Sequence, residues 1–243
     1  MLVYRTAERY ELESRKFKVK SKARSFCDYC GKQLRWYENV PVISWLVQKG
    51  KTRCCDKKLP VLYPIVELGV GILFFLYNLR FSIFDFNIFT WILGLIIIIF
   101  LVFSAVFDLK YMILPDFSTI ILMVSSLIIW FVRYFGNWSY LWSGLISFLF
   151  LGFLYLVTKK KGMGFGDVKL AFFMGLFLGY PKVIIAFYIT FIVGALVALF
   201  LMAVKKVSKK TAIPFGPFLI LGTLVAWFWG HEMVSLSVFQ FIK

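Results

Sequence analysis

One stretch places an acidic residue directly after three glycines, at the mouth of an apolar segment: Gly162-Met163-Gly164-Phe165-Gly166-Asp167-Val168-Lys169-Leu170. Because glycine has no side chain, this loop would let another backbone approach Asp167 closely. A charged group at a membrane segment costs about 2.5 to 3.5 kcal/mol on insertion scales, which favours a functional role. The alternative is that Asp167 only caps the helix that begins at Val168.

Apolar residues dominate the rest of the chain. Of 243 residues, 61% are hydrophobic and 20% aromatic, whereas 12 are acidic and 28 are lysine or arginine. A soluble domain rarely has this balance, so the composition predicts a polytopic membrane protein. The first 60 residues contain 15 of the 28 basic residues. We therefore expect a basic head, residues 1–60, and an all-α transmembrane bundle, residues 61–243.

Segments long enough to span a bilayer recur along the expected bundle, and seven spans are the simplest count. The fifth has only about 12 residues, so we expect it to enter the bilayer only in part. The segments are Val61–Tyr77, Ile88–Phe107, Phe117–Phe135, Trp138–Val157, Val168–Gly179, Val183–Val204 and Phe215–Gly230.

The loops between these segments alternate in charge. The head and every second loop hold most of the lysines and arginines, and the opposite loops hold only Arg80, Arg133, Lys182 and Lys243. The positive-inside rule then predicts a multi-pass protein of the inner (plasma) membrane with a cytoplasmic head. A basic patch can also indicate nucleic acid binding. Topology and anionic lipid already account for this charge, so we expect the lipid bilayer and no nucleic acid as a partner.

All four cysteines lie in the head. Cys27 and Cys30 form a C-x-x-C knuckle, and the adjacent Cys54 and Cys55 follow after 23 intervening residues. Four thiolates suit one tetrahedral zinc site, which we expect to be structural. The alternative is a set of reduced thiols, since disulfides are disfavoured in the cytosol.

The expected topology brings acidic side chains to one membrane surface. Asp108 ends the second segment and Asp167 begins the fifth, so both lie on the cytoplasmic side. Two carboxylates in a partly dry cleft can hydrolyse a peptide, because one takes a proton from water while the other donates one to the scissile carbonyl. Asp116 lies at the same level, but it follows Pro115 where a helix N-cap belongs, so capping is its simpler interpretation.

Several motifs resemble those of the type IV prepilin peptidases. Asp108-Leu109-Lys110-Tyr111-Met112-Ile113-Leu114-Pro115-Asp116 resembles the family's D-x6-P-D motif, and Gly164-Phe165-Gly166-Asp167 resembles its G-x-G-D motif. Similar stretches in the family's order are the C-x-x-C knuckle, Trp36–Pro41 with Ser44-Trp45, Tyr63–Glu67 and Pro214–Phe218.

The resemblance implies a membrane aspartic peptidase that removes the short basic leader of prepilin or pseudopilin substrates, cutting after glycine at the cytoplasmic face. The family's catalytic aspartates fall on Asp108 and Asp167, and proteolysis needs no cofactor. A substrate would lie beside the glycine loop, where Gly164 and Gly166 offer backbone contacts. Asp116, at the same membrane level, is a further candidate substrate-binding residue.

The resemblance also implies a second activity for the cysteine-bearing loop. Many members methylate the new N-terminus with S-adenosylmethionine, and Glu38 is a candidate residue for that task. The alternative is that Glu38 is an exposed residue of a turn. The chain departs from the family pattern because the third family cysteine falls on Thr52 and Cys54 is out of register. The chain also starts where the family's first transmembrane helix would end, so we expect that span to be lost or truncated.

Two other functions remain open at this point. A presenilin-like intramembrane peptidase also uses G-x-G-D, although it does not explain the cysteine loop or the Leu-Pro-Asp turn. A non-enzymatic membrane transporter or scaffold could instead line a polar path with the same acids. Loss of peptide cleavage on replacing Asp108 or Asp167 would distinguish the peptidases from the transporter.

Overall fold

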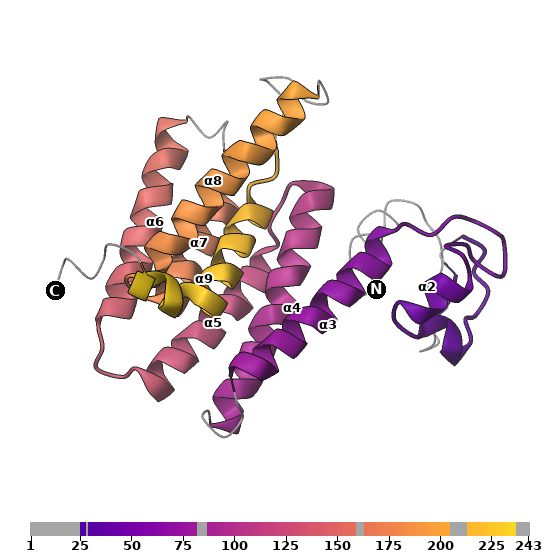
Figure 1. Cartoon of the computed structure of the whole chain (residues 1–243), viewed down its shortest axis with the longest axis horizontal. Helices are drawn as coiled ribbons and strands as arrows, with labels where there is room; N and C mark the ends of the chain where they lie inside the picture. The colour runs from indigo at the N-terminus through magenta and orange to yellow at the C-terminus, as the bar shows by residue number, and fades with distance from the viewer. Residues whose placement is uncertain (1–24, 28, 82–86, 159–162, 205–212, 237–243) are drawn as a thin grey trace. The chain divides into compact units, whose positions relative to one another are not determined.

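The computed structural model describes residues 25–27, 29–81, 87–158, 163–204 and 213–236, and most of these residues are helical (Figure 1). Outside the helices, the described part of the chain has two isolated β-bridges, both in the head. The chain divides into two compact units, Met1–Leu76 and Tyr77–Lys243. The boundary lies inside helix α3, Leu62–Arg80. An all-α membrane fold is therefore confirmed.

The first unit contains short elements before α3. A 3₁₀ helix, η1, covers Trp36–Asn39, and helix α2 covers Ile43–Val47. The N–H of Val42, the residue before α2, donates to the Glu67 carboxylate of α3 at 2.8 Å. Glu67 therefore has a structural partner within this unit.

A helix occupies every segment that the sequence predicts to be apolar and long. After α3 these are α4 (Ile88–Tyr111), α5 (Asp116–Arg133), α6 (Ser139–Val157), α7 (Phe165–Leu178), α8 (Lys182–Ala203) and α9 (Gly216–Leu236). Among the described residues, six helices are long and apolar enough to cross a membrane, and α7 is the predicted segment that is not among them. With 14 residues, α7 extends over only about 21 Å, compared with a hydrocarbon core of about 30 Å.

Helix α7 is short because it forms the core of the second unit. It packs against α5, α6, α8 and α9. Six of its side chains are almost completely buried: Val168, Leu170, Ala171, Phe173, Met174 and Leu176. A helix that is apolar on all sides is one that neighbours surround. Other helices therefore cover α7, and it does not need the length of a lipid-facing span.

Small residues allow α6 and α7 to approach closely. A Cβ added to Gly175 of α7 would lie 2.2 Å from the carbonyl oxygen of Ser143 and 2.6 Å from Oγ of Ser147, both on α6. A Cβ added to Gly144 of α6 would lie 3.3 Å from the backbone nitrogen of Leu176. Contacts of this kind are typical of helix pairs in membranes, where close van der Waals packing replaces the hydrophobic effect.

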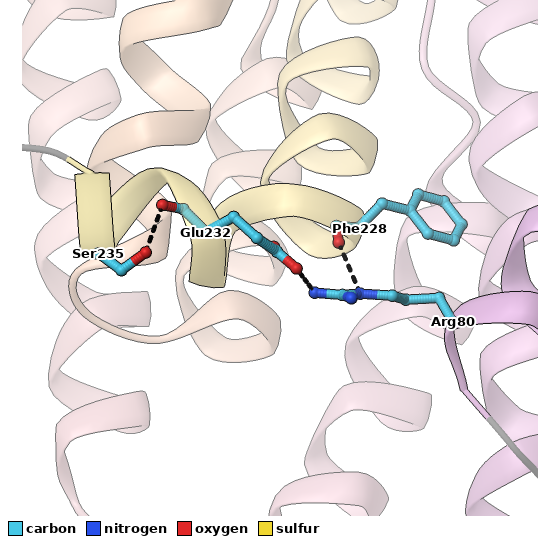
Figure 2. A network of polar contacts seen from close by, with 4 residues as sticks. All are labelled: Arg80, Phe228, Glu232 and Ser235. Carbon is cyan, nitrogen blue, oxygen red and sulfur yellow. Dashed lines mark hydrogen bonds and ion pairs between the residues drawn. The ribbon is translucent and has the colours of Figure 1, made fainter.

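Polar contacts join the end of α3 to the end of α9 in the second unit, as Figure 2 shows. Arg80 donates from Nε to the Phe228 carbonyl oxygen at 3.1 Å, and its guanidinium pairs with the Glu232 carboxylate. Ser235 Oγ donates to the backbone oxygen of Glu232 at 2.7 Å. The ion pair between Arg80 and Glu232 therefore holds the C-terminal end of α9, whereas Gly216 begins that helix.

We expect Gly175→Ala to destabilise the bundle, because its Cβ would meet the Ser143 backbone, which cannot move without shifting α6. Overpacking of this kind costs about 1 to 3 kcal/mol. The measurement is the unfolding midpoint of purified protein in detergent. Gly152→Ala is the matched control, because its Cβ would lie an ordinary 3.7 Å from Val168. Equal losses in the two variants would contradict the packing described here.

Candidate active site and cysteine cluster

Asp108 lies in the last turn of α4. The sequence predicts that this segment ends at Phe107, but the helix continues to Tyr111 and therefore includes Asp108. The Asp108 side chain is buried and only 5% exposed. Met112 then adopts a left-handed conformation, with φ of 54°, and its N–H donates to the Asp108 carbonyl oxygen at 2.8 Å. This cap ends α4 one turn after the aspartate.

The carboxylate of Asp108 contacts the beginning of α9. Its Oδ2 accepts a hydrogen bond from the Gly216 N–H at 3.0 Å. The first N–H groups of a helix have no partner within the helix and carry partial positive charge. The start of α9 therefore gives a buried acid a donor from a residue 108 positions away.

Asp167 lies inside the first turn of α7. This helix begins at Phe165, three residues before the expected start at Val168, with Gly164 as its N-cap. Asp167 is 6% exposed, and its Oδ2 accepts the Gly164 N–H at 3.1 Å. Asp167 is the third residue of the helix, and its Oδ2 caps the helix start. Its Oδ1 is then available to contact water or substrate.

The two aspartates lie close enough for their charges to repel each other. Helix α9 packs against both α4 and α7, the helices that carry them. Two buried acids from separate helices, each with one backbone donor, match the carboxylate pair expected from the sequence. Such a pair can supply both a proton acceptor and a proton donor for hydrolysis.

The two motif glycines have different surroundings. A Cβ at Gly166 would lie 2.8 Å from Cβ of Leu114, so the chain's own D-x6-P-D segment fills that space. A Cβ at Gly164 would meet nothing closer than Asp167 Oδ2 at 3.7 Å. Since α7 begins at Phe165, Gly166 belongs to the helix, contrary to its expected place in a loop. Gly164 is therefore the glycine with room beside it.

Asp116 does not have the capping role that is its simpler interpretation. Pro115 occupies the N-cap of α5, and Asp116 is the first helical residue. Its Oδ1 pairs with Lys169 Nζ at 2.7 Å, while its side chain remains 69% exposed. Lys169 lies two residues after Asp167, so the ion pair joins the two aspartate motifs at the protein surface.

Glu38 has a local partner in η1. Its Oε2 accepts the Arg35 N–H at 2.7 Å, and Arg35 in turn donates to the Tyr37 hydroxyl. Glu38 thus stabilises the turn in which it lies, as the simpler interpretation expects. Its proposed part in methylation stays a prediction.

The four cysteine sulfurs of the head form one cluster. All four Sγ atoms lie within 4.8 Å of one another, and none is in a disulfide. Cys27 and Cys55 are 3.8 Å apart, Cys54 and Cys55 3.9 Å, and Cys30 and Cys54 3.1 Å. Four sulfurs at about 2.3 Å from a tetrahedral zinc ion would be about 3.8 Å apart. The cluster therefore fits one zinc ion, with a slight widening at Cys30 and Cys54.

Two similar turns carry these cysteines. In the first, the Cys27 N–H donates to the Lys32 oxygen at 2.8 Å, and Gly31 has a positive φ. In the second, the Thr52 N–H donates to the Lys57 oxygen at 2.9 Å. Asp56 has the positive φ of that turn. Thr52 thus occupies the position that corresponds to Cys27.

Cys54 supplies the sulfur that Thr52 lacks. The Thr52 hydroxyl contacts Cys55 Sγ at 3.1 Å and lowers the pKa of the Cys55 thiol to about 7. The thiolate is the form that binds metals. With Cys54 in place of a cysteine at position 52, four sulfurs still lie together, and the Thr52 hydroxyl lies beside them.

Sequence reasoning missed three contacts of the site residues. These are Gly216 with Asp108, Leu114 with Gly166, and Thr52 with Cys55. The sequence identifies Pro214–Phe218 only as a stretch similar to one in the prepilin peptidases. In that stretch, Gly216 lies between Phe215 and Pro217 at the start of a helix. This was the one signal in the sequence that a backbone N–H without a helical partner lies there.

Comparisons with known proteins cover both parts of the chain. Residues 2–81 match the family model of the bacterial peptidase A24 N-terminal domain, and residues 95–199 match that of the type IV leader peptidase family. No solved structure gave a significant match.

Curated relatives match over most of the chain. A prepilin leader peptidase/N-methyltransferase of Legionella pneumophila is 34% identical, covering 94% of this chain and 81% of the relative. Proteins of the same description from Stutzerimonas stutzeri and Bacillus subtilis are 32% and 28% identical. They cover 90% and 88% of this chain, which in turn spans 76% and 85% of their lengths.

We expect elemental analysis of the purified protein to give about one zinc per chain, because four sulfurs already lie at distances suited to one ion. Cys54→Ser should lower the zinc content strongly, since it removes a ligand that stands outside the usual spacing. Thr52→Ser is the matched control, because it keeps the hydroxyl beside Cys55 and removes no sulfur. A folded protein with four reduced cysteines and no zinc would exclude the site.

Proposed function

Because the chain belongs to the type IV leader peptidase family, we propose that Asp108 and Asp167 are the aspartates that catalyse its cleavage reaction. The protein is a multi-pass membrane peptidase that processes prepilin-like proteins. The observation that supports the catalytic assignment is the burial of both carboxylates, from separate helices, close enough to repel each other. Family membership favours this function over a presenilin-like peptidase or a transporter.

The reaction follows from a carboxylate pair that holds one proton between its two members. The ionised member takes a proton from a water molecule, whose oxygen attacks the scissile carbonyl carbon. The protonated member gives its proton to the carbonyl oxygen. When the tetrahedral intermediate breaks down and its C–N bond breaks, the carboxyl that took the proton from water gives it to the leaving amine. A hydroxyl of the intermediate returns a proton to the other carboxylate as the new carboxyl group of the product forms. The pair is thereby regenerated.

The helix ends stabilise this pair without removing its reactivity. Asp108 and Asp167 each accept one backbone N–H through Oδ2. That contact fixes the direction of each carboxylate and leaves Oδ1 for water or substrate. Electrostatic groups held in advance are effective because they need not reorganise during the reaction.

The proposed substrate path begins beside Gly164. The open side of this residue gives an extended substrate backbone room next to Asp167. Gly166, which contacts Leu114, would act chiefly by keeping the two aspartate motifs together, although direct contact with substrate through its backbone is still part of the proposal. The exposed Asp116 carboxylate would attract the basic leader of a prepilin or pseudopilin.

The head is proposed to lie in the cytoplasm and to serve N-methylation, since the curated relatives carry both activities in their descriptions. Cys27, Cys30, Cys54 and Cys55 would hold a structural zinc ion. The methyl donor would be S-adenosylmethionine, and Glu38 would lie near the methylation site. The boundary between a head of residues 1–60 and a bundle of residues 61–243 is part of this proposal.

Single variants of the two aspartates test the peptidase assignment. Asp108→Asn and Asp167→Asn should each lower cleavage of a prepilin peptide with glycine at the cut site. The loss should be about 10²- to 10⁴-fold, as for other lost acid–base groups. Asp56→Asn is the matched control, because Asp56 is exposed, belongs to the other compact unit and has a positive φ that asparagine tolerates. Cleavage is read by mass spectrometry, and full activity without either buried aspartate would refute the assignment.

Variants of the head test whether the two activities are separate. Cys30→Ser should abolish methylation of the new N-terminus by S-adenosylmethionine and leave at least part of the cleavage activity. The reason is that the cysteines and the aspartates belong to different compact units. Product masses with and without S-adenosylmethionine report both reactions in one experiment. Equal loss of cleavage and methylation would show that the proposed separation is wrong.

A further inference from the structure

Gly216 has two properties that bear on Asp108, one chemical and one steric. Its N–H donates to Asp108 Oδ2 at 3.0 Å in a buried position. A Cβ added to Gly216 would lie 2.6 Å from the same oxygen and 3.1 Å from Asp108 Cγ. Real Cβ atoms do not approach so closely, so any other residue would force the carboxylate away.

Backbone conformation does not explain this glycine. Four glycines of the described chain have a positive φ, namely Gly31, Gly50, Gly136 and Gly179, and Gly216 is not among them. An L-residue would therefore adopt the backbone angles of Gly216 without strain. The requirement for glycine comes from the space that the Asp108 side chain occupies.

Most of the residues around Gly216 have no free N–H for the carboxylate. Pro214 and Pro217 have no N–H to offer. The N–H groups of Phe218 and Leu219 both donate to the Phe215 carbonyl oxygen, at 3.1 and 3.3 Å. At this helix start, the donor directed at Asp108 is that of Gly216. The Gly216 N–H binds Oδ2 of Asp108 and leaves Oδ1 without a contact to this helix start.

We propose that Gly216 is a positioning residue for the cleavage reaction, which sets the orientation of Asp108 through its N–H and its missing side chain. This inference rests on the proposed catalytic role of Asp108. With Oδ2 held by the start of α9, the Asp108 carboxylate cannot rotate freely, and Oδ1 is presented to the reacting groups. A displacement of about 1 Å in a catalytic group can cost about 100-fold in rate.

The kinetic test compares glycine-to-alanine variants. Gly216→Ala should lower kcat for the prepilin peptide about 100-fold and leave KM nearly unchanged, because Asp108 acts on the reaction and not on substrate binding. Gly194→Ala on α8 is the activity control, since its Cβ would lie 3.6 Å from the Phe218 ring, an ordinary contact. A wild-type kcat in Gly216→Ala, or a loss confined to KM, would overturn the proposal.

A stability test separates positioning of Asp108 from general helix packing, and it needs no activity. Gly216→Ala should lower the melting temperature clearly when Asp108 is present and much less in the Asp108→Ala background, where the clashing atoms are gone. Gly222→Ala, on the same helix, should lower it equally in both backgrounds. Its Cβ would meet the Ala186 oxygen and Thr190 Oγ1, both at 2.4 Å.

Each outcome of the stability test has a defined meaning. Equal losses for Gly216→Ala in both backgrounds would overturn the proposal, because the glycine would then serve packing alone. If Gly216→Ala does not fold, folding of the Asp108→Ala/Gly216→Ala double variant supports the proposal, and failure of both overturns it. If the unaltered protein cleaves no prepilin peptide, the proposed function fails, while the stability comparison still tests the contact.

Discussion

Burial of two neighbouring acidic side chains, Asp108 and Asp167, is the constraint on which the bundle depends. An isolated carboxylate is costly to place in an apolar interior, and two that repel each other are costlier still. The structure compensates with backbone donors at two helix starts, Gly164 for Asp167 and Gly216 for Asp108. Both donors are glycine N–H groups, so each acid approaches the backbone without a side chain between them. The contact between Asp108 and Gly216 joins α4 to α9, so an acid as well as apolar packing determines the position of α9.

The length of α7 follows from the same constraint. A helix that spans the whole bilayer would place its first turn at the membrane surface, where Asp167 would remain in contact with water. In the 14-residue α7, neighbouring helices bury Asp167 and Val168, whereas Phe165 at the helix start remains 48% exposed. Gly175 and Gly144 make this enclosure tight, because α6 approaches α7 almost to backbone contact. A closely packed helix also holds Asp167 in a constant direction, which a loop would not.

Composition and the spacing of residues along the chain predicted the features that depend on short stretches of sequence. The seven apolar segments, the aspartate pair and the four-cysteine cluster all follow from composition and spacing. The contact between Gly216 and Asp108 does not, because no periodicity relates residues 108 positions apart. The place of Gly166 inside a helix was missed for a similar reason. Its lack of a side chain suggested a loop open to a substrate, whereas the space is filled by Leu114, which is adjacent only after α5 has packed against α7.

The cysteine cluster shows how the spacing of cysteines can change while four sulfurs stay close together. The turn around Thr52 repeats the hydrogen bonds of the turn around Cys27, so the backbone would present a third cysteine at position 52. With threonine there, the next sulfur available is Cys54, and it lies on the same turn within reach of the other three. A tetrahedral zinc ion has no geometric preference from its d-electrons, so it tolerates such a substitution better than most transition metals do. The ligand count is thus preserved, and the altered spacing alone is no argument against a metal in the head.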